Sequence, residues 1–135
     1  MAIWRKAVGV ALLFSVVGCG GDHPDVGRVN GKVTLDGSPL VAATVMFQPT
    51  GSGRASYGVT DAQGSYTLDY VDGVKGAVIG SHKVIIKTEI PGEDGQPPKV
   101  KEKLSPRYHA QTELKAEVKS GANSYDFPLE SAGKK

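Results

Sequence analysis

The chain has 135 residues, with 16 basic and 14 acidic side chains and one cysteine. That length suits one domain around one hydrophobic core, and a lone cysteine excludes an internal disulfide. Two of the 16 basic residues, Arg5 and Lys6, lie in the first 18 positions, so residues 19–135 carry 14 basic and 14 acidic side chains. A domain with balanced charge has no strong positive field, which disfavours nucleic-acid binding.

The first 18 residues have the layout of a secretory signal. Arg5 and Lys6 precede an apolar run at residues 7–17, and small residues stand at its end. A helix that spans a bilayer needs about 20 apolar residues, so this run is too short to remain as a membrane span. We therefore expect residues 1–18 to be a signal peptide that is cleaved from the mature protein.

The segment Val16-Val17-Gly18-Cys19 resembles the lipobox of bacterial lipoproteins. The resemblance implies cleavage between Gly18 and Cys19, a diacylglyceryl group on the Cys19 thiol, and acylation of the new amino terminus, for example with palmitate. Stable attachment needs more than one acyl chain, because a single chain holds a protein only marginally. No other cofactor is expected. The alternatives are a plain secretory signal with an incidental cysteine, or a free thiol in an exported protein.

These features place the protein in the cell envelope, attached to a membrane through its lipid. Gly20 follows the cysteine, which favours the outer membrane or the periplasmic face. Residues 19–27 are small and polar and are expected to form a lipidated tether. His23 lies among aspartates there, but a flexible segment does not preorganise a metal site, so a solvated linker is the better interpretation.

From residue 29 onward, apolar and polar residues alternate with a period of two, as in strands with one buried face. Turn-forming residues separate the alternating stretches. The strands expected from this alternation cover residues 29–35, 44–48, 114–118 and 125–129. The apolar centre of residues 82–88 predicts a further strand in the middle of a sheet. A polar tail, residues 131–135, ends the chain.

Residues 55–70 carry the strongest hairpin signal. Asp61 is expected to cap the turn at residues 61–64 by accepting backbone N–H groups, while Gly64 takes the left-handed conformation. A single carboxylate cannot satisfy a calcium ion, so a structural turn is preferred to a calcium site. The apolar residues of both hairpin arms are expected to face the same core: Ala55, Tyr57, Val59, Tyr66, Leu68 and Tyr70.

Residues 89–107 form a long loop with four prolines and no sustained periodicity. Loops of more than about 12 to 15 residues are uncommon in compact domains and are usually functional or mobile. The loop is therefore a possible partner-binding element, and a solvated insertion is the alternative. Its candidate contact residues are the charged Glu93, Asp94, Lys99, Lys101, Lys103 and Arg107, with Tyr108 as an aromatic contact.

The hairpin and the five separate strands give about seven strands, and no helix is indicated after the signal. Regularly spaced short strands of this kind favour a β-sandwich, which we place at residues 28–130. The predicted fold class is therefore all-β.

Several segments, in this order and spacing, resemble the carboxypeptidase regulatory-like domain. They are Gly31-Lys-Val-Thr-Leu-Asp-Gly-Ser-Pro-Leu, Ala43-Thr-Val-Met-Phe, Gly58-Val-Thr-Asp-Ala-Gln-Gly-Ser-Tyr-Thr-Leu and Gly80-Ser-His-Lys-Val-Ile-Ile. The ending, Ser105-Pro-Arg-Tyr to Asn123-Ser-Tyr-Asp-Phe-Pro-Leu, is similar to small bacterial lipoproteins with one copy of this domain. The resemblance implies a transthyretin-like (prealbumin-like) sandwich of seven antiparallel strands in Greek-key order.

An enzymatic role is not expected. The transthyretin-like hydroxyisourate hydrolases resemble this fold but end in Tyr-Arg-Gly-Ser, whereas this chain ends in Glu-Ser-Ala-Gly-Lys-Lys. The three histidines, His23, His82 and His109, are too scattered for a metallopeptidase, and His82 is expected to be partly exposed. Convergence of distant residues keeps a hydrolase as a minor alternative.

The leading interpretation is a lipid-anchored, non-catalytic binding module of the cell envelope. Its ligand would be an envelope protein, a peptide or a glycan, contacted through the loop at residues 89–107. A structural spacer or packing protein of the envelope is the alternative.

Overall fold

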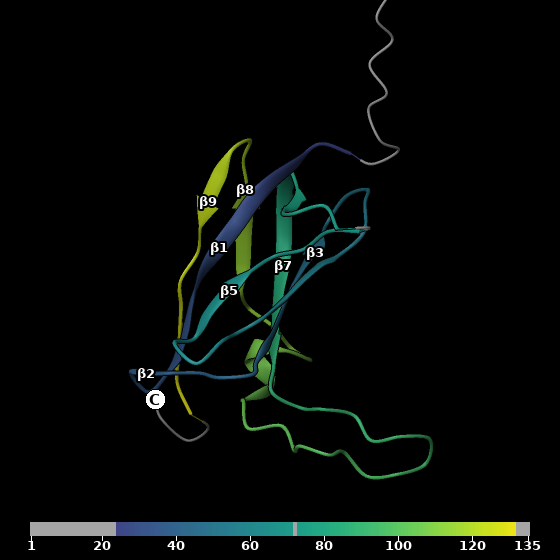
Figure 1. The fold of residues 1–135 in the computed structure, drawn as a ribbon, viewed down its shortest axis with the longest axis vertical. Coiled ribbons are helices and arrows are strands. Elements are labelled where there is room, and N and C mark those ends of the chain that lie inside the picture. The colour runs from purple at the N-terminus through teal and green to yellow at the C-terminus, as the bar shows by residue number, and fades with distance from the viewer. Residues whose placement is uncertain (1–23, 72, 132–135) are drawn as a thin grey trace, which may run out of the picture.

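The computed structural model describes residues 24–71 and 73–131. The expected signal peptide, Gly18, Cys19, the first part of the tether and the end of the polar tail lie outside these residues. Within them the chain forms strands and one short 3-10 helix, η1 (Pro106–Tyr108), so the all-β fold class is confirmed for the described part (Figure 1).

The strands form two sheets. The first sheet contains β1 (Val26–Leu35), β2 (Ser38–Pro39), β5 (Ser65–Thr67), β6 (Ala77–Val78), β9 (Ala122–Ser124) and β10 (Phe127–Leu129). The second sheet contains β3 (Thr44–Pro49), β4 (Ser56–Val59), β7 (Gly80–Lys87) and β8 (Lys115–Val118).

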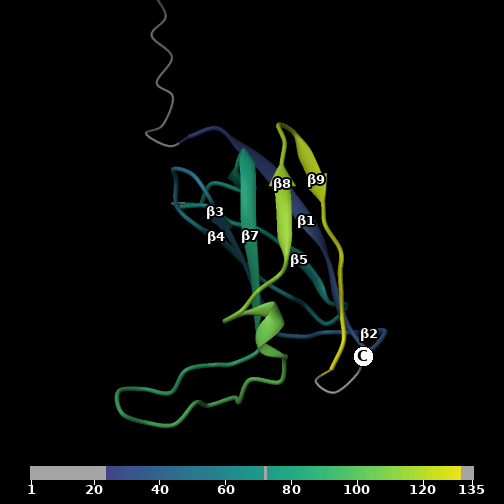
Figure 2. The ribbon, with the colours of Figure 1, turned by 180° about the vertical axis from the view of Figure 1, so that it is seen from behind.

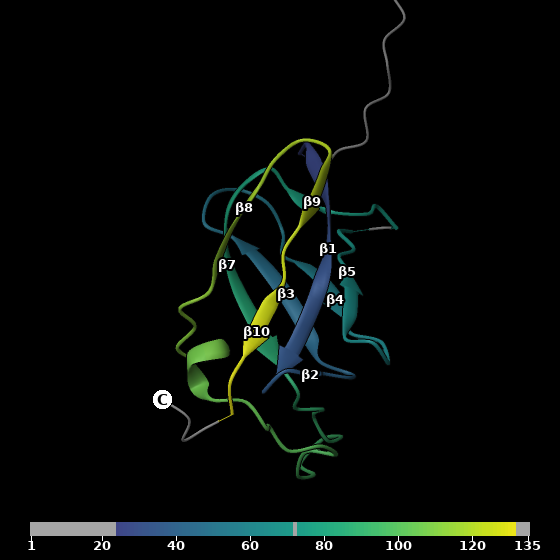
Figure 3. The ribbon, with the colours of Figure 1, turned by 90° about the vertical axis from the view of Figure 1, so that its left-hand side faces the viewer.

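Strand β1 is the centre of the first sheet and runs along its whole length (Figures 1 and 3). It pairs with β6, β5 and β2 in antiparallel fashion, and with β9 and β10 in parallel. Because β2 and β10 both pair with Leu35, they must lie on opposite edges of β1. The short partners are thus held together by one long strand that is bonded on both edges.

The second sheet is antiparallel throughout, in the order β4-β3-β7-β8, and Figure 2 shows β7 and β8 from its outer side. Its inward residues in β3 and β7 are apolar apart from His82, and Val45, Phe47, Val84 and Ile86 are fully buried. The sequence predicts this alternation for β3. For β7 it predicts a strand in the middle of a sheet, and β7 lies between β3 and β8.

The strand count and directions differ from the seven antiparallel strands that the resemblance implies. Ten strand segments are present in the described residues, and two of the pairings of β1 are parallel. One reason is that the expected strand at residues 125–129 is interrupted, because the Asp126 carboxylate accepts the N–H of Lys32 at 2.9 Å. The other is that the chain crosses from β8 in one sheet to β9 in the other, so no hairpin fixes its direction.

One core fills the space between the sheets. Between ring centroids, Phe47 of the second sheet lies 6.2 Å from Phe127 of the first sheet and 6.1 Å from Tyr125, which follows β9. His82 belongs to the same cluster, since its ring is 5.6 Å from Phe47 and it is only 2% exposed. The expectation of a partly exposed His82 is wrong, because its position in β7 points into the core.

The hairpin at residues 55–70 is built differently from the prediction. Tyr57 and Val59 are 53% and 62% exposed, whereas Ser56 and Thr60 are buried. The hydroxyl of Thr60 accepts the N–H of Ala43 at 2.8 Å, which satisfies an inward polar group and fixes this register. The expectation that Tyr57 and Val59 face the core is therefore wrong.

The two hairpin arms also belong to different sheets. They meet through paired backbone hydrogen bonds between Tyr57 and Asp69, while β5 bonds to β1 rather than to β4. Next to this contact, the carbonyl group of Thr67 lies very close to Gly58. A Cβ atom on residue 58 would stand 2.6 Å from the Thr67 carbonyl oxygen. Glycine at position 58 lets the two sheets approach at this corner.

The turn between the arms is closed by Asp61. Its Oδ1 accepts the N–H groups of Gln63 and Ser65, both at 2.9 Å, and Gly64 has a φ of 76°. A Cβ on Gly64 would also stand 2.5 Å from the Val33 carbonyl oxygen. Position 64 therefore requires glycine both for its backbone conformation and for its space.

Candidate functional site

The loop predicted at residues 89–107 divides into a projecting part and a packed part. Residues 89–103, which we call the arm, leave the end of β7 and extend beyond the two sheets (Figures 1 and 2). Backbone hydrogen bonds join Ile90 and Val100 at 3.0 and 3.3 Å, and the N–H of Gln96 donates to the Glu93 carbonyl at 2.7 Å. The arm is thus held by one isolated β-bridge and by one turn near its tip.

Glu102 closes the base of the arm. Its carboxylate accepts the hydroxyl of Thr88 at 2.6 Å and the backbone N–H of Thr88 at 3.0 Å. It also accepts the N–H groups of Glu89, Lys103 and Leu104 at 3.1 to 3.2 Å. One side chain therefore ties the outgoing chain to the returning chain and satisfies four backbone donors.

The pKa of Glu102 reflects this arrangement. Partial burial acts to raise the pKa of the carboxyl group, but the hydrogen bonds from the Thr88 side chain and from backbone N–H groups outweigh it. The net result is a lowered pKa, because all of these donors favour the charged form. Glu102 was absent from the predicted site, since nothing in Lys101-Glu102-Lys103 distinguishes it from a solvated charge run.

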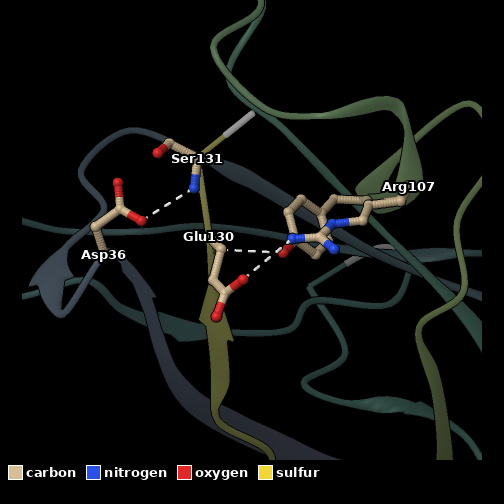
Figure 4. A network of polar contacts seen from close by, with 5 residues as sticks. Asp36, Arg107, Glu130 and Ser131 are labelled. Carbon is tan, nitrogen blue, oxygen red and sulfur yellow. Dashed lines mark hydrogen bonds and ion pairs between the residues drawn. The ribbon is translucent and has the colours of Figure 1, made fainter. Parts of the chain in front are cut away.

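The returning end of the arm is anchored on the core. Leu104 and Tyr108 are buried, and the Tyr108 hydroxyl accepts the N–H of Glu130 at 3.0 Å. The Arg107 guanidinium lies 4.8 Å from the centre of the Tyr108 ring. It also lies 3.6 Å from the Glu130 carboxylate (Figure 4). The same figure shows Asp36 accepting the N–H of Ser131, so both contacts hold the end of β10 in place.

The predicted contact residues therefore fall into two groups. Tyr108 is 7% exposed, so the expectation that it offers a surface aromatic contact is wrong; its ring is needed in the core. Arg107 lies beside it and serves the same anchor. The other predicted residues lie exposed on the arm: Glu93, Asp94, Lys99, Lys101 and Lys103.

The tip of the arm carries an ion pair beside a shallow hollow. Glu93 and Lys99 form an ion pair across it at 3.5 Å, although both side chains are well exposed. A shallow hollow of about 280 Å³ is lined by Gly92, Gln96 and Pro97 together with this pair. An exposed pair contributes little to stability, about 0 to 1 kcal/mol, so these side chains are available to a partner.

The arm and the start of β1 lie at opposite ends of the molecule in all three ribbon views (Figures 1 to 3). A chain that enters at residue 24 therefore runs the length of the sheets before it reaches the arm. Any attachment preceding β1 would leave the arm at the far end.

The remaining polar candidates do not join the arm. His82 is in the core, and His109 Nε2 stands 3.1 Å from the Leu104 carbonyl oxygen. In the part of the chain that the structure describes, no three His, Cys, Asp or Glu side chains gather in a way that could hold a metal ion. Nor is any helix of that part long and apolar enough to cross a membrane.

The arm is thus a clamped, exposed element whose ends are fixed by hydrogen bonds and core packing and whose tip carries charges of both signs. Comparison with models of protein families and with curated proteins found no match to this chain.

Proposed function

We propose that this protein is a lipid-anchored lipoprotein of the cell envelope that acts as a non-catalytic binding module, with the arm as its contact element. Lipid on Cys19 would hold it to the outer membrane or the periplasmic face. The ligand would be an envelope protein, a peptide or a glycan. The described residues form an all-β fold of two sheets, which is the coarser part of this assignment. The finer part, a single carboxypeptidase regulatory-like domain of transthyretin-like, Greek-key type, rests on the resemblance of the sequence segments.

The observation that carries this proposal is the clamp at the base of the arm. Glu102 and Thr88 fix the two ends of the arm, while the tip between them contributes nothing evident to the core. Ordering an exposed segment costs conformational entropy, about 1 to 2 kcal/mol per residue for the backbone. A segment kept ordered in this way, at the end far from residue 24, is suited to bind a partner with little further entropy loss.

The experiment that tests the arm is crosslinking in cells. The tagged full chain is crosslinked, purified from membranes and analysed by mass spectrometry, beside a variant in which residues 91–99 are replaced by glycine and serine. This replacement spares Glu102 and the Ile90–Val100 bridge, so the base stays closed. We expect the free energy of unfolding to change by less than about 0.5 kcal/mol and the partner to be lost.

A second variant, Glu102→Ala, serves as the matched control because it loosens the base and keeps every side chain of the tip. Partners lost in the tip variant and weakened in Glu102→Ala support an ordered binding arm. The same neighbours in both variants and in the parent protein would instead favour the spacer.

The membrane anchor has its own test. We expect Cys19→Ala to leave the protein unprocessed or soluble, because the thiol that would carry the lipid is gone. Membrane fractionation and the mass of the amino-terminal peptide measure this. Correct cleavage together with firm membrane attachment of Cys19→Ala would contradict the lipoprotein assignment.

A further inference from the structure

The outer surface of the second sheet has an unusual distribution of side chains. Strand β4 turns Tyr57 and Val59 to solvent and buries Ser56, and Thr60 directly after the strand is buried too. A strand that only covers a core would show the reverse pattern. Exposed large apolar residues gathered in one place are informative, whereas single ones are common. We define the outer face by the outward residues of the four strands: Tyr57, Val59, Thr44, Met46, Gln48, Ser81, Lys83, Ile85, Lys87, Lys115 and Glu117.

The pairing register places the apolar members next to one another. Met46 pairs with Tyr57 on one side and with Ile85 on the other, so these three side chains form a row across the sheet. The next row holds Val59, Thr44 and Lys87. A hollow of about 210 Å³ lies between the rows, lined by Thr44, Met46, Tyr57, Ile85 and Lys87.

Lys87 lines the hollow, and two more lysines lie farther along the same face. Lys83 and Lys87 are exposed and flank Ile85 on the same side of the strand, and Lys115 stands directly opposite Lys83 on β8. Like charges directly opposite each other on a sheet are destabilising. Within residues 24–71 and 73–131 none of these lysines has an ion pair, and the acidic side chain of the neighbouring row is Glu117, opposite Ser81.

We propose that the outer face binds an extended acidic protein segment in which an apolar residue lies midway between two carboxylates. Alternate residues of an extended segment point to the same side, so the positions i, i+2 and i+4 face the sheet together. When the segment lies along β7, its two carboxylates meet Lys83 and Lys87. These lysines are about 13 Å apart along the strand, at 3.3 Å per residue. The central side chain of the segment then enters the hollow beside Ile85.

Charge complementarity selects this occupant. A neutral ligand would cover the apolar row but leave Lys83, Lys87 and Lys115 without counter-charges, and desolvating an unpaired charge is costly. An acidic segment supplies carboxylates at the lysines and relieves the repulsion between Lys83 and Lys115. No residue of this surface belongs to the arm, so the inference does not depend on the function proposed for the arm.

A fluorescein-labelled peptide with the sequence Ser-Thr-Glu-Thr-Leu-Thr-Glu-Thr-Ser is the probe. Its binding to the full chain, purified in nonionic detergent, is followed by fluorescence anisotropy at low ionic strength. We expect saturable binding that weakens at least tenfold for the rearranged peptide Ser-Thr-Leu-Thr-Glu-Glu-Thr-Thr-Ser, which has the same composition. This comparison uses the unaltered protein, so it does not depend on how any variant folds.

The double variant Lys83→Gln/Lys87→Gln is expected to weaken binding at least tenfold. The control Lys32→Gln/Lys119→Gln removes the same charge from exposed side chains outside both the outer face and the arm, and it is expected to leave binding unchanged. Equal losses in both variants, equal binding of the two peptides, or no binding at millimolar peptide would overturn the proposal. Tighter binding of dextran sulfate, or of vesicles containing phosphatidylglycerol, through Lys83 and Lys87 would overturn it in favour of a polyanionic glycan or a lipid surface.

Discussion

Two connections in this molecule, the turn at residues 61–64 and the arm, are each closed by one carboxylate that accepts backbone N–H groups. Asp61 reaches donors only two and four residues ahead of it. Glu102 reaches Thr88 and Glu89, 14 and 13 residues behind it, as well as its own neighbours. The chemistry is shared, but the length of chain enclosed is very different.

This difference decides how far the residues enclosed by each carboxylate can be substituted. In the turn, the residues enclosed by the carboxylate are also the residues that set the backbone, and Gly64 is packed against the Val33 carbonyl. In the arm, the closing contacts lie at the base, so the tip can change without altering the closure. The turn joins two strands, whereas the base of the arm supports a segment whose side chains are free for another purpose.

The largest effect on stability is expected at the turn. Gly64→Val must adopt a φ of 76° and place a Cβ 2.5 Å from a backbone oxygen. We expect the free energy of unfolding to fall by about 2 to 5 kcal/mol, from backbone strain and overpacking combined. Urea unfolding followed by circular dichroism measures it, and an unchanged midpoint would mean that the turn is not held as described.

At the base of the arm, Glu102→Ala removes the acceptor of four backbone donors. We expect a loss of about 1 to 2 kcal/mol in the free energy of unfolding, since these donors become accessible to water once the base opens. Hydrogen exchange should quicken first at the amides of Thr88 and Leu104. Faster exchange spread evenly over the two sheets would contradict a local role for Glu102.

The same carboxylate gives a pH dependence with a definite sign. Because the folded state lowers the pKa of Glu102 below 4.5, its stabilisation is fully present above that value and is lost as pH falls through the lower, folded pKa. The difference in unfolding free energy between the parent and Glu102→Gln should therefore be constant above about pH 5.5 and shrink under more acidic conditions. A difference that grows on acidification would contradict the hydrogen-bonded carboxylate.

A smaller effect is expected from Asp61→Ala. It removes two local hydrogen bonds at an exposed turn, and the loss of such a cap costs about 1 kcal/mol. Asp61→Asn, whose side-chain oxygen can still accept, should recover part of this. Equal losses in the two variants, measured by thermal unfolding, would show that charge rather than hydrogen bonding is what matters at this position.

The contrast between local and distant contacts also explains which features could be predicted from the sequence. The alternation in β3 follows from residues one and two positions apart, and so does the chemistry of the Asp61 turn. The closure by Glu102 depends on Thr88, which is distant in the sequence, and no local pattern marks the pair. Such features become visible only when the fold brings the two segments together.

The inverted strand β4 was mispredicted for a related reason. By hydrophobicity alone, Tyr57 and Val59 belong inside, but the partner of Thr60 is the distant Ala43 and the neighbour of Gly58 is Thr67. These contacts decide the register against the local pattern. Tyr108 shows the opposite error, because a polar, proline-rich context suggested exposure while its hydroxyl meets Glu130 in the folded chain.

The central position of β1 also bears on the order in which the domain can be completed. β1 is synthesised before every other strand described, yet one of its edges is covered by β9 and β10, and Lys32 bonds to Asp126, 94 residues later. A nascent chain that stops before residue 122 keeps that edge open, with Val33 lacking its partner Phe127. An unpaired strand edge can form hydrogen bonds with another chain. The sheet can therefore be closed against such pairing only after β9 and β10 have been synthesised.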